Sequence, residues 1–263
     1  MGIFSRVTAS VKDLLNKKQY DKANDKAKTI AVLMEAEMAG KTPAIGPYVE
    51  HPLHKARLQQ YIKNVEDYNN LPPALQTAKG TIAFGDSLID IPRGEFCSIN
   101  EKLNFAISGS WANHMEQMAV DIFHLLFQKG MTIKNVVVGT LGGNPLLSYQ
   151  DVDATVKISY DCLDKLRRIF PFAKIIVYGL PPVYNAYATR NSIKFESNMF
   201  EWVNKDDNAV FVPLFSKFGQ GLFNLTPNVV TSSDGVHLTH NGVVILDNLF
   251  DKAKSAKPKS IID

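Results

Sequence analysis

The chain has 263 residues, of which 45% are hydrophobic and 21% are charged, values typical of a globular protein with one sizeable core. Its net charge of +3 is too small to indicate a nucleic-acid partner, and no apolar run approaches the ~18 residues that a membrane-spanning helix needs. The two cysteines lack the spacing of a metal site, and the first residues lack the apolar segment of a signal peptide. We therefore expect no nucleic acid as partner, no membrane span and a cytoplasmic or virion-associated location.

Residues 1–75 are expected to be helical. Apolar residues at helical spacing predict two helices before Gly40 and a third from roughly Leu53 to Tyr68. Asparagines and prolines at 69–73 favour a break after the third helix. None of these residues suggests chemistry. We interpret 1–75 as a helical N-terminal extension that packs on the rest of the chain, forms a homo-oligomer or attaches to a partner, and the remainder, 76–263, as the main domain.

Strands alternate with helices from Gly80 onward. The strand candidates are Thr81–Phe84, Leu103–Ile107, Val136–Leu141, Ala173–Gly179 and Ala209–Leu214. Helical patterns cover about 111–128, 150–169, 192–204 and 239–255. This alternation predicts an α/β fold, a parallel sheet with helices on both faces. Ligands of such sheets bind at the carboxyl ends of the strands, so residues just after each strand are the candidates for function.

Ser87 follows the first predicted strand. A serine hydroxyl is a weak nucleophile, and it needs a base to take its proton and a third group to orient that base. Asp234 and His237 stand three residues apart near the end of the chain, and a carboxylate can fix the tautomer of a histidine base. The alternative is that Asp234 caps the last helix and His237 is an ordinary surface histidine.

Two glycine turns follow the second and third predicted strands. Acyl transfer places negative charge on a carbonyl oxygen, and N–H donors aimed at that oxygen form an oxyanion hole. Gly109 can bring its backbone N–H close to a substrate, and the side-chain amide of Asn144, after Gly142 and Gly143, can donate as well. The alternative for both segments is ordinary turn chemistry.

Together these segments resemble the SGNH (GDSL) hydrolases. The matching blocks are Gly85-Asp86-Ser87-Leu88, Gly109, Gly142-Gly143-Asn144 and Asp234-Gly235-Val236-His237. Their order, spacing and strand context fit, and the resemblance covers about residues 80–255. One departure is Pro145, which stands where the third block of the family usually has an aspartate.

The resemblance implies a flavodoxin-like three-layer α/β/α sandwich with a five-stranded parallel sheet. It also implies that Ser87 is the nucleophile, His237 the base and then the acid, and Asp234 the residue that orients His237. The N–H groups of Ser87 and Gly109 and the amide of Asn144 would form the oxyanion hole. No metal and no organic cofactor would be needed.

We expect a serine ester hydrolase that forms an acyl-enzyme and removes short acyl groups, such as O-acetyl, from a carbohydrate or another small ester. Two alternatives remain open at this point. One is an acyltransferase that uses the same triad. The other is a non-catalytic binding or structural protein of a virion or cell surface, built on the same scaffold.

Overall fold

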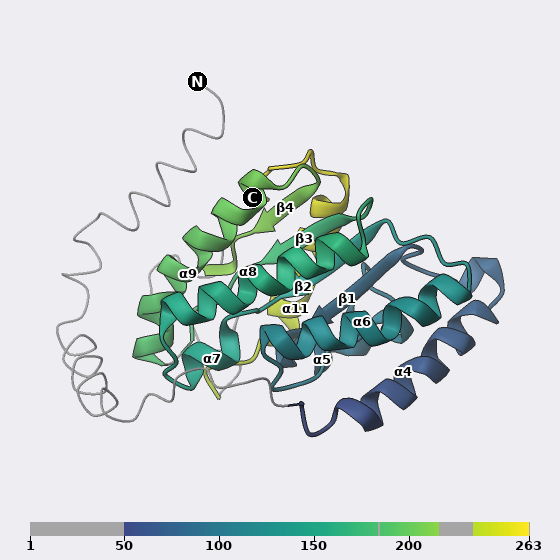
Figure 1. Ribbon diagram of the computed structural model, residues 1–263, viewed down its shortest axis with the longest axis horizontal. Coiled ribbons are helices and arrows are strands. Elements are labelled where there is room, and N and C mark those ends of the chain that lie inside the picture. The colour runs from purple at the N-terminus through teal and green to yellow at the C-terminus, as the bar shows by residue number, and fades with distance from the viewer. Residues whose placement is uncertain (1–49, 184, 216–233, 263) are drawn as a thin grey trace.

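The computed structural model describes residues 50–183, 185–215 and 234–262, and the two helices expected before Gly40 lie outside these ranges. Four parallel strands form its centre (Figure 1), in the order β1-β2-β3-β4. They are β1 (Thr81–Gly85), β2 (Asn135–Gly139), β3 (Lys174–Tyr178) and β4 (Ala209–Val212). Almost every strand residue is buried, as expected of apolar runs in a sheet that is covered on both faces.

The predicted fifth strand, Leu103–Ile107, is not a regular strand. Its first residue, Leu103, belongs instead to the 3-10 helix η3 (Glu101–Leu103), and Asn104 forms an isolated parallel bridge with Ala83. The Asn104 side chain accepts from the N–H of Ala106 at 3.1 Å, a local bond that competes with regular pairing. The segment still runs beside β1, since the N–H of Phe105 donates to Ala83 at 2.8 Å. If this segment is counted as the second strand, the strands lie in the order 2-1-3-4-5, which is the order of flavodoxin.

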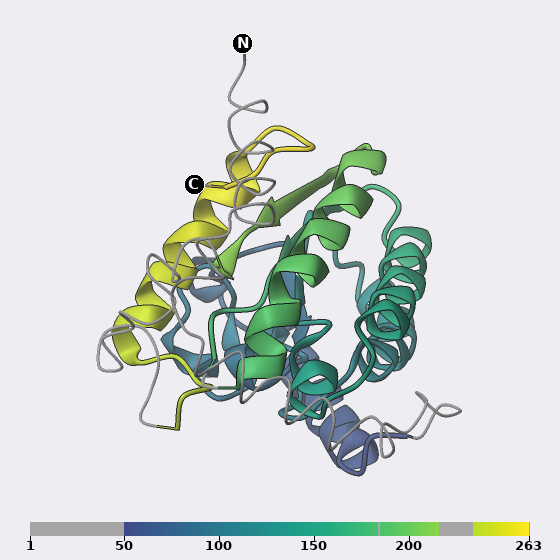
Figure 2. The same cartoon turned by 90° about the vertical axis from the view of Figure 1, so that its left-hand side faces the viewer.

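The helices form one layer on each face of the sheet. The longer ones are α4 (His54–Asn69), α6 (Ala112–Gln128), α8 (Val152–Ile169), α9 (Ala186–Lys205) and α11 (His240–Ser255). The short ones are α5 (Ser87–Asp90), α7 (Gly143–Leu147), η1 (Pro73–Leu75) and η2 (Arg93–Glu95). One apolar cluster joins α4, α6, α8 and α9 to the sheet, and the other joins α5 and α11 to its opposite face (Figure 2). This is the expected three-layer α/β/α sandwich.

The helix α4 belongs to the first of these layers. Its Tyr61, Val65 and Tyr68 are buried in the same cluster as Phe84 of β1 and Phe105. Within the segment that the sequence sets apart as an extension, α4 therefore packs on the main domain, one of the arrangements expected for it. The boundary near residue 75 stays a prediction. Among the described residues, no helix is long and apolar enough to cross a bilayer.

Candidate active site

Ser87 lies at the carboxyl edge of the sheet, directly after β1. Gly85 ends the strand, and a side chain there would lie 2.6 Å from the carbonyl oxygen of Gly139 on β2, so only glycine fits. Asp86 then caps α5 by accepting from the N–H of Leu88 at 3.1 Å. Ser87 is the first residue of α5 and is half-buried, which leaves its hydroxyl within reach of a substrate.

Asp86 forms a buried anchor beneath this edge, a role that the sequence pattern alone did not assign to it. Its side chain is buried and accepts hydrogen bonds from the Thr140 hydroxyl and, at 3.3 Å, from the Asn144 amide. Burial raises the pKa of Asp86 to about 6, and the bond from Thr140 acts in the opposite direction. The loops that follow β1 and β2 are thus joined through one carboxylate.

Asn144 lies on α7 and reaches the carboxyl edge as predicted. Its Nδ2 donates to the Ser110 carbonyl at 3.0 Å and to Asp86 Oδ2 at 3.3 Å. An amide NH2 has two hydrogens, so both are used by oxygen atoms of the protein. Asn144 therefore ties the Gly109 turn to Asp86, and to serve an oxyanion it must exchange the longer of its two bonds.

Gly109 follows the segment that runs beside β1. Its φ of +84° lies in the left-handed region that favours glycine, and its backbone is exposed. Within the described residues, neither its N–H nor that of Ser87 donates to a protein acceptor. Two backbone donors at neighbouring strand ends are therefore left for a ligand, as an oxyanion hole requires.

Asp234 and His237 form a pair in the loop before α11. Asp234 Oδ2 lies 2.6 Å from His237 Nδ1, and Asp234 Oδ1 accepts from the N–H of His237 at 3.0 Å. A carboxylate at Nδ1 places the proton there and leaves the lone pair of Nε2 available as a base. Thr239, not Asp234, caps α11. The alternative role for Asp234 as a cap of that helix is therefore excluded.

His237 lies close enough to Asp86 that, when its ring is protonated, its positive charge lowers the pKa of that carboxyl, against the larger effect of burial. His237 therefore lies in the neighbourhood of Ser87. No hydrogen bond joins the two residues in the described part of the chain, although catalytic bonds of ligand-free enzymes are often long. In those same ranges, no group of three or more His, Cys, Asp or Glu side chains could hold a metal ion.

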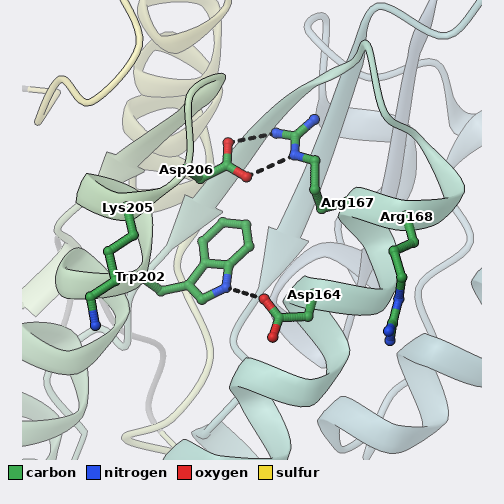
Figure 3. A pocket seen from close by; sticks show the side chains of 6 residues that line it. All are labelled: Asp164, Arg167, Arg168, Trp202, Lys205 and Asp206. Atoms are coloured by element: carbon green, nitrogen blue, oxygen red, sulfur yellow. Dashed lines mark hydrogen bonds and ion pairs between the residues drawn. The ribbon is translucent and has the colours of Figure 1, made fainter.

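A cavity of about 370 Å³ lies elsewhere, between the last turns of α8 and α9 (Figure 3). Its lining side chains are largely bonded to each other. Arg167 holds Asp206 with two bonds of 2.7 Å, and Trp202 Nε1 donates to Asp164 at 2.8 Å. Both helices end just before β3 and β4 begin, so the cavity lies at the amino edge of the sheet, opposite Ser87. We assign it no part in the chemistry.

No protein-family profile matches the sequence, and no curated protein matches it. Solved structures do share its fold. A protein from Bacteroides fragilis, assigned as an acylhydrolase, is 17% identical over 76% of this chain and 96% of its own, with a TM-score of 0.53. A protein from Streptococcus pneumonia, assigned as a platelet activating factor, is 16% identical over 76% and 94%, with a TM-score of 0.52. A GDSL-like lipase from Bacteroides thetaiotaomicron is 16% identical over 75% and 98%, with a TM-score of 0.50. The resemblance to the SGNH (GDSL) hydrolases that the sequence blocks indicate is confirmed at the level of the fold.

Proposed function

We propose that the protein is a serine ester hydrolase that acts through an acyl-enzyme on Ser87. The observation that carries this proposal is the contact of 2.6 Å between His237 Nδ1 and Asp234 Oδ2, which leaves His237 Nε2 available as a base. The unused N–H groups of Ser87 and Gly109 support it, because they supply donors for the oxygen that becomes negative.

The reaction follows from these groups. Ser87 Oγ attacks the carbonyl carbon of the ester while its proton passes to His237 Nε2, and the electron pair of the C=O bond moves to the oxygen held by the two N–H groups. Collapse of this intermediate expels the alkoxide, which takes the proton back from Nε2. Water then attacks the acyl-enzyme by the same route and releases the acid.

Within this class we propose short acyl groups, O-acetyl on a carbohydrate or another small ester, as substrates. The sequence has no long apolar segment that could cover an acyl chain. Acyl transfer to an alcohol is the second candidate, and it is favoured by the exposure of Gly109 and the half-buried position of Ser87, which leave the site open to acceptors other than water.

The test is turnover of p-nitrophenyl acetate together with labelling by a fluorophosphonate probe. Wild-type protein should hydrolyse the ester and be labelled, and Ser87→Ala should do neither. Ser148→Ala is the matched control, because Ser148 is an exposed serine at the end of α7 and should be dispensable. An added alcohol that captures the acyl group faster than water does would identify a transferase. Equal labelling of wild type and Ser87→Ala would exclude the triad, and absence of turnover with all esters would favour a binding protein.

A further inference from the structure

His51, just before α4, reaches the turn that carries Gly109. The residue is 8% exposed, and its Nε2 lies 3.2 Å from the carbonyl oxygen of Ser108, 57 residues further along the chain. Its Nδ1 accepts from the N–H of Leu53 at 3.1 Å. A backbone N–H can only donate, so Nδ1 carries no proton and the neutral ring holds its proton on Nε2. His51 therefore donates to the Ser108 carbonyl.

That carbonyl belongs to the same peptide unit as the N–H of Gly109. In a trans peptide the C=O and the N–H point in opposite directions. A donor fixed on the carbonyl side therefore directs the Gly109 N–H away from His51, toward the exposed side of the turn. A hydrogen bond to the carbonyl also polarises the amide and makes its N–H a stronger donor.

The other side of Ser108 is held as well. Asp90 Oδ2 accepts from the N–H of Ser108 at 2.8 Å and from its hydroxyl at 2.7 Å. Arg93 pairs with Asp90 Oδ1 at 2.7 Å and donates to the carbonyl of Ala106 at 2.9 Å. Ser108 is thus held on both sides by buried side chains: Asp90 holds its N–H and hydroxyl, and His51 holds its carbonyl, which shares a peptide unit with the Gly109 N–H.

We propose that His51 is a positioning residue for the oxyanion donor: through its bond to the Ser108 carbonyl, it orients and polarises the peptide that carries the Gly109 N–H. This proposal rests on the proposed function and adds to it a residue from the segment that sequence patterns set apart from catalysis. The neutral state that the bond requires is favoured by burial, which lowers the pKa of His51 more than its bond to Ser108 raises it.

Two substitutions separate this role from a local structural one. In His51→Asn, the shorter amide can still accept from the N–H of Leu53 but cannot reach Ser108. In His51→Gln, the longer amide places an N–H donor where Nε2 stood. A residue needed only for the local turn would tolerate Asn better than Gln, and a positioning residue would show the reverse order.

The experiment measures kcat and KM on p-nitrophenyl acetate with the full chain, together with thermal unfolding. Loss of an oxyanion donor lowers kcat by roughly 100- to 1000-fold, and a misdirected donor should cost part of that. We expect His51→Asn to lower kcat about 10-fold or more with KM nearly unchanged, and His51→Gln to stay within about 3-fold of wild type.

Equal kcat values for wild type and a folded His51→Asn would overturn the role of His51 and leave the esterase assignment intact. A wild-type protein without turnover or Ser87 labelling would overturn both. If His51→Asn does not fold, His51→Gln keeps the proposal testable: a folded variant with kcat about 10-fold lower than wild type refutes it.

Discussion

Replacing Asp86 with asparagine should remove a defined part of the pH dependence of stability. Burial raises the pKa of this carboxyl to about 6, from an ordinary 3.8. A rise of that size, at about 1.4 kcal/mol per pKa unit, corresponds to about 3 kcal/mol. The folded protein therefore binds this proton more tightly than the unfolded chain does. The protonated Asp86 carboxyl therefore adds its full contribution to the free energy of unfolding below about pH 4, and this contribution is lost as the pH rises through 6.

The assay is urea unfolding of wild type and Asp86→Asn between pH 4 and 7. We expect the variant to gain about 3 kcal/mol relative to wild type across this range, whatever its starting stability. Asp90→Asn is the control. Burial raises the pKa of Asp90, but the bonds from Arg93 and Ser108 outweigh burial and lower it below 3.8. The stability that this carboxylate contributes is therefore already present above about pH 4, so the curves of Asp90→Asn and wild type should run nearly parallel between pH 4 and 7. Parallel stability curves for wild type and Asp86→Asn would refute the reasoning.

Three further outcomes are expected. Asn144→Ala should fold and lose roughly 100-fold or more in kcat, since it removes a donor and frees the Gly109 turn; an unchanged kcat would show that the amide faces no oxyanion. His237→Ala should fold and lose roughly 100-fold or more in kcat, because no base remains to take the Ser87 proton, and an unchanged kcat would exclude His237 as the base. A chain that starts at residue 74 should not fold, because it lacks the buried Tyr61 and its neighbours on α4, each worth on the order of 3 kcal/mol. A chain that starts at residue 50 should fold, as circular dichroism and thermal melting would report, and a folded protein from residue 74 onward would contradict the placement of α4 in the core.

The sheet was predictable because its strands are short apolar runs buried on both faces. Each of the four strands coincides with a predicted one to within two residues at either end. The edge segment was not predictable in the same way. Hydrophobicity identifies Leu103–Ile107 as a strand, but the local bond of Asn104 to Ala106 prevents regular pairing, and an apolar pattern does not report such a bond.

The contacts of the candidate site that join residues close in sequence were predictable, and those that join residues far apart in sequence were not. The pair of Asp234 and His237 lies within four residues, so spacing alone suggested it. The contact of His51 with Ser108 joins residues 57 positions apart, and neither motif nor periodicity brings them together. The same holds for Asp86, whose bonds come from a loop more than fifty residues away.

Arg167 ties together several chain segments at the amino edge of the sheet. Besides holding Asp206, the Arg167 guanidinium donates to the carbonyls of Phe170, Ala173 and Asn208 at 2.8–3.2 Å. One side chain thus fastens the entrances of β3 and β4 to each other. The loops at the opposite, carboxyl edge are tied separately, through the bonds of Asp86 to Thr140 and Asn144. The two ends of the sheet are therefore held by different side chains, and a substitution of Arg167 should loosen the entrances of β3 and β4 without breaking the bonds that position Asn144.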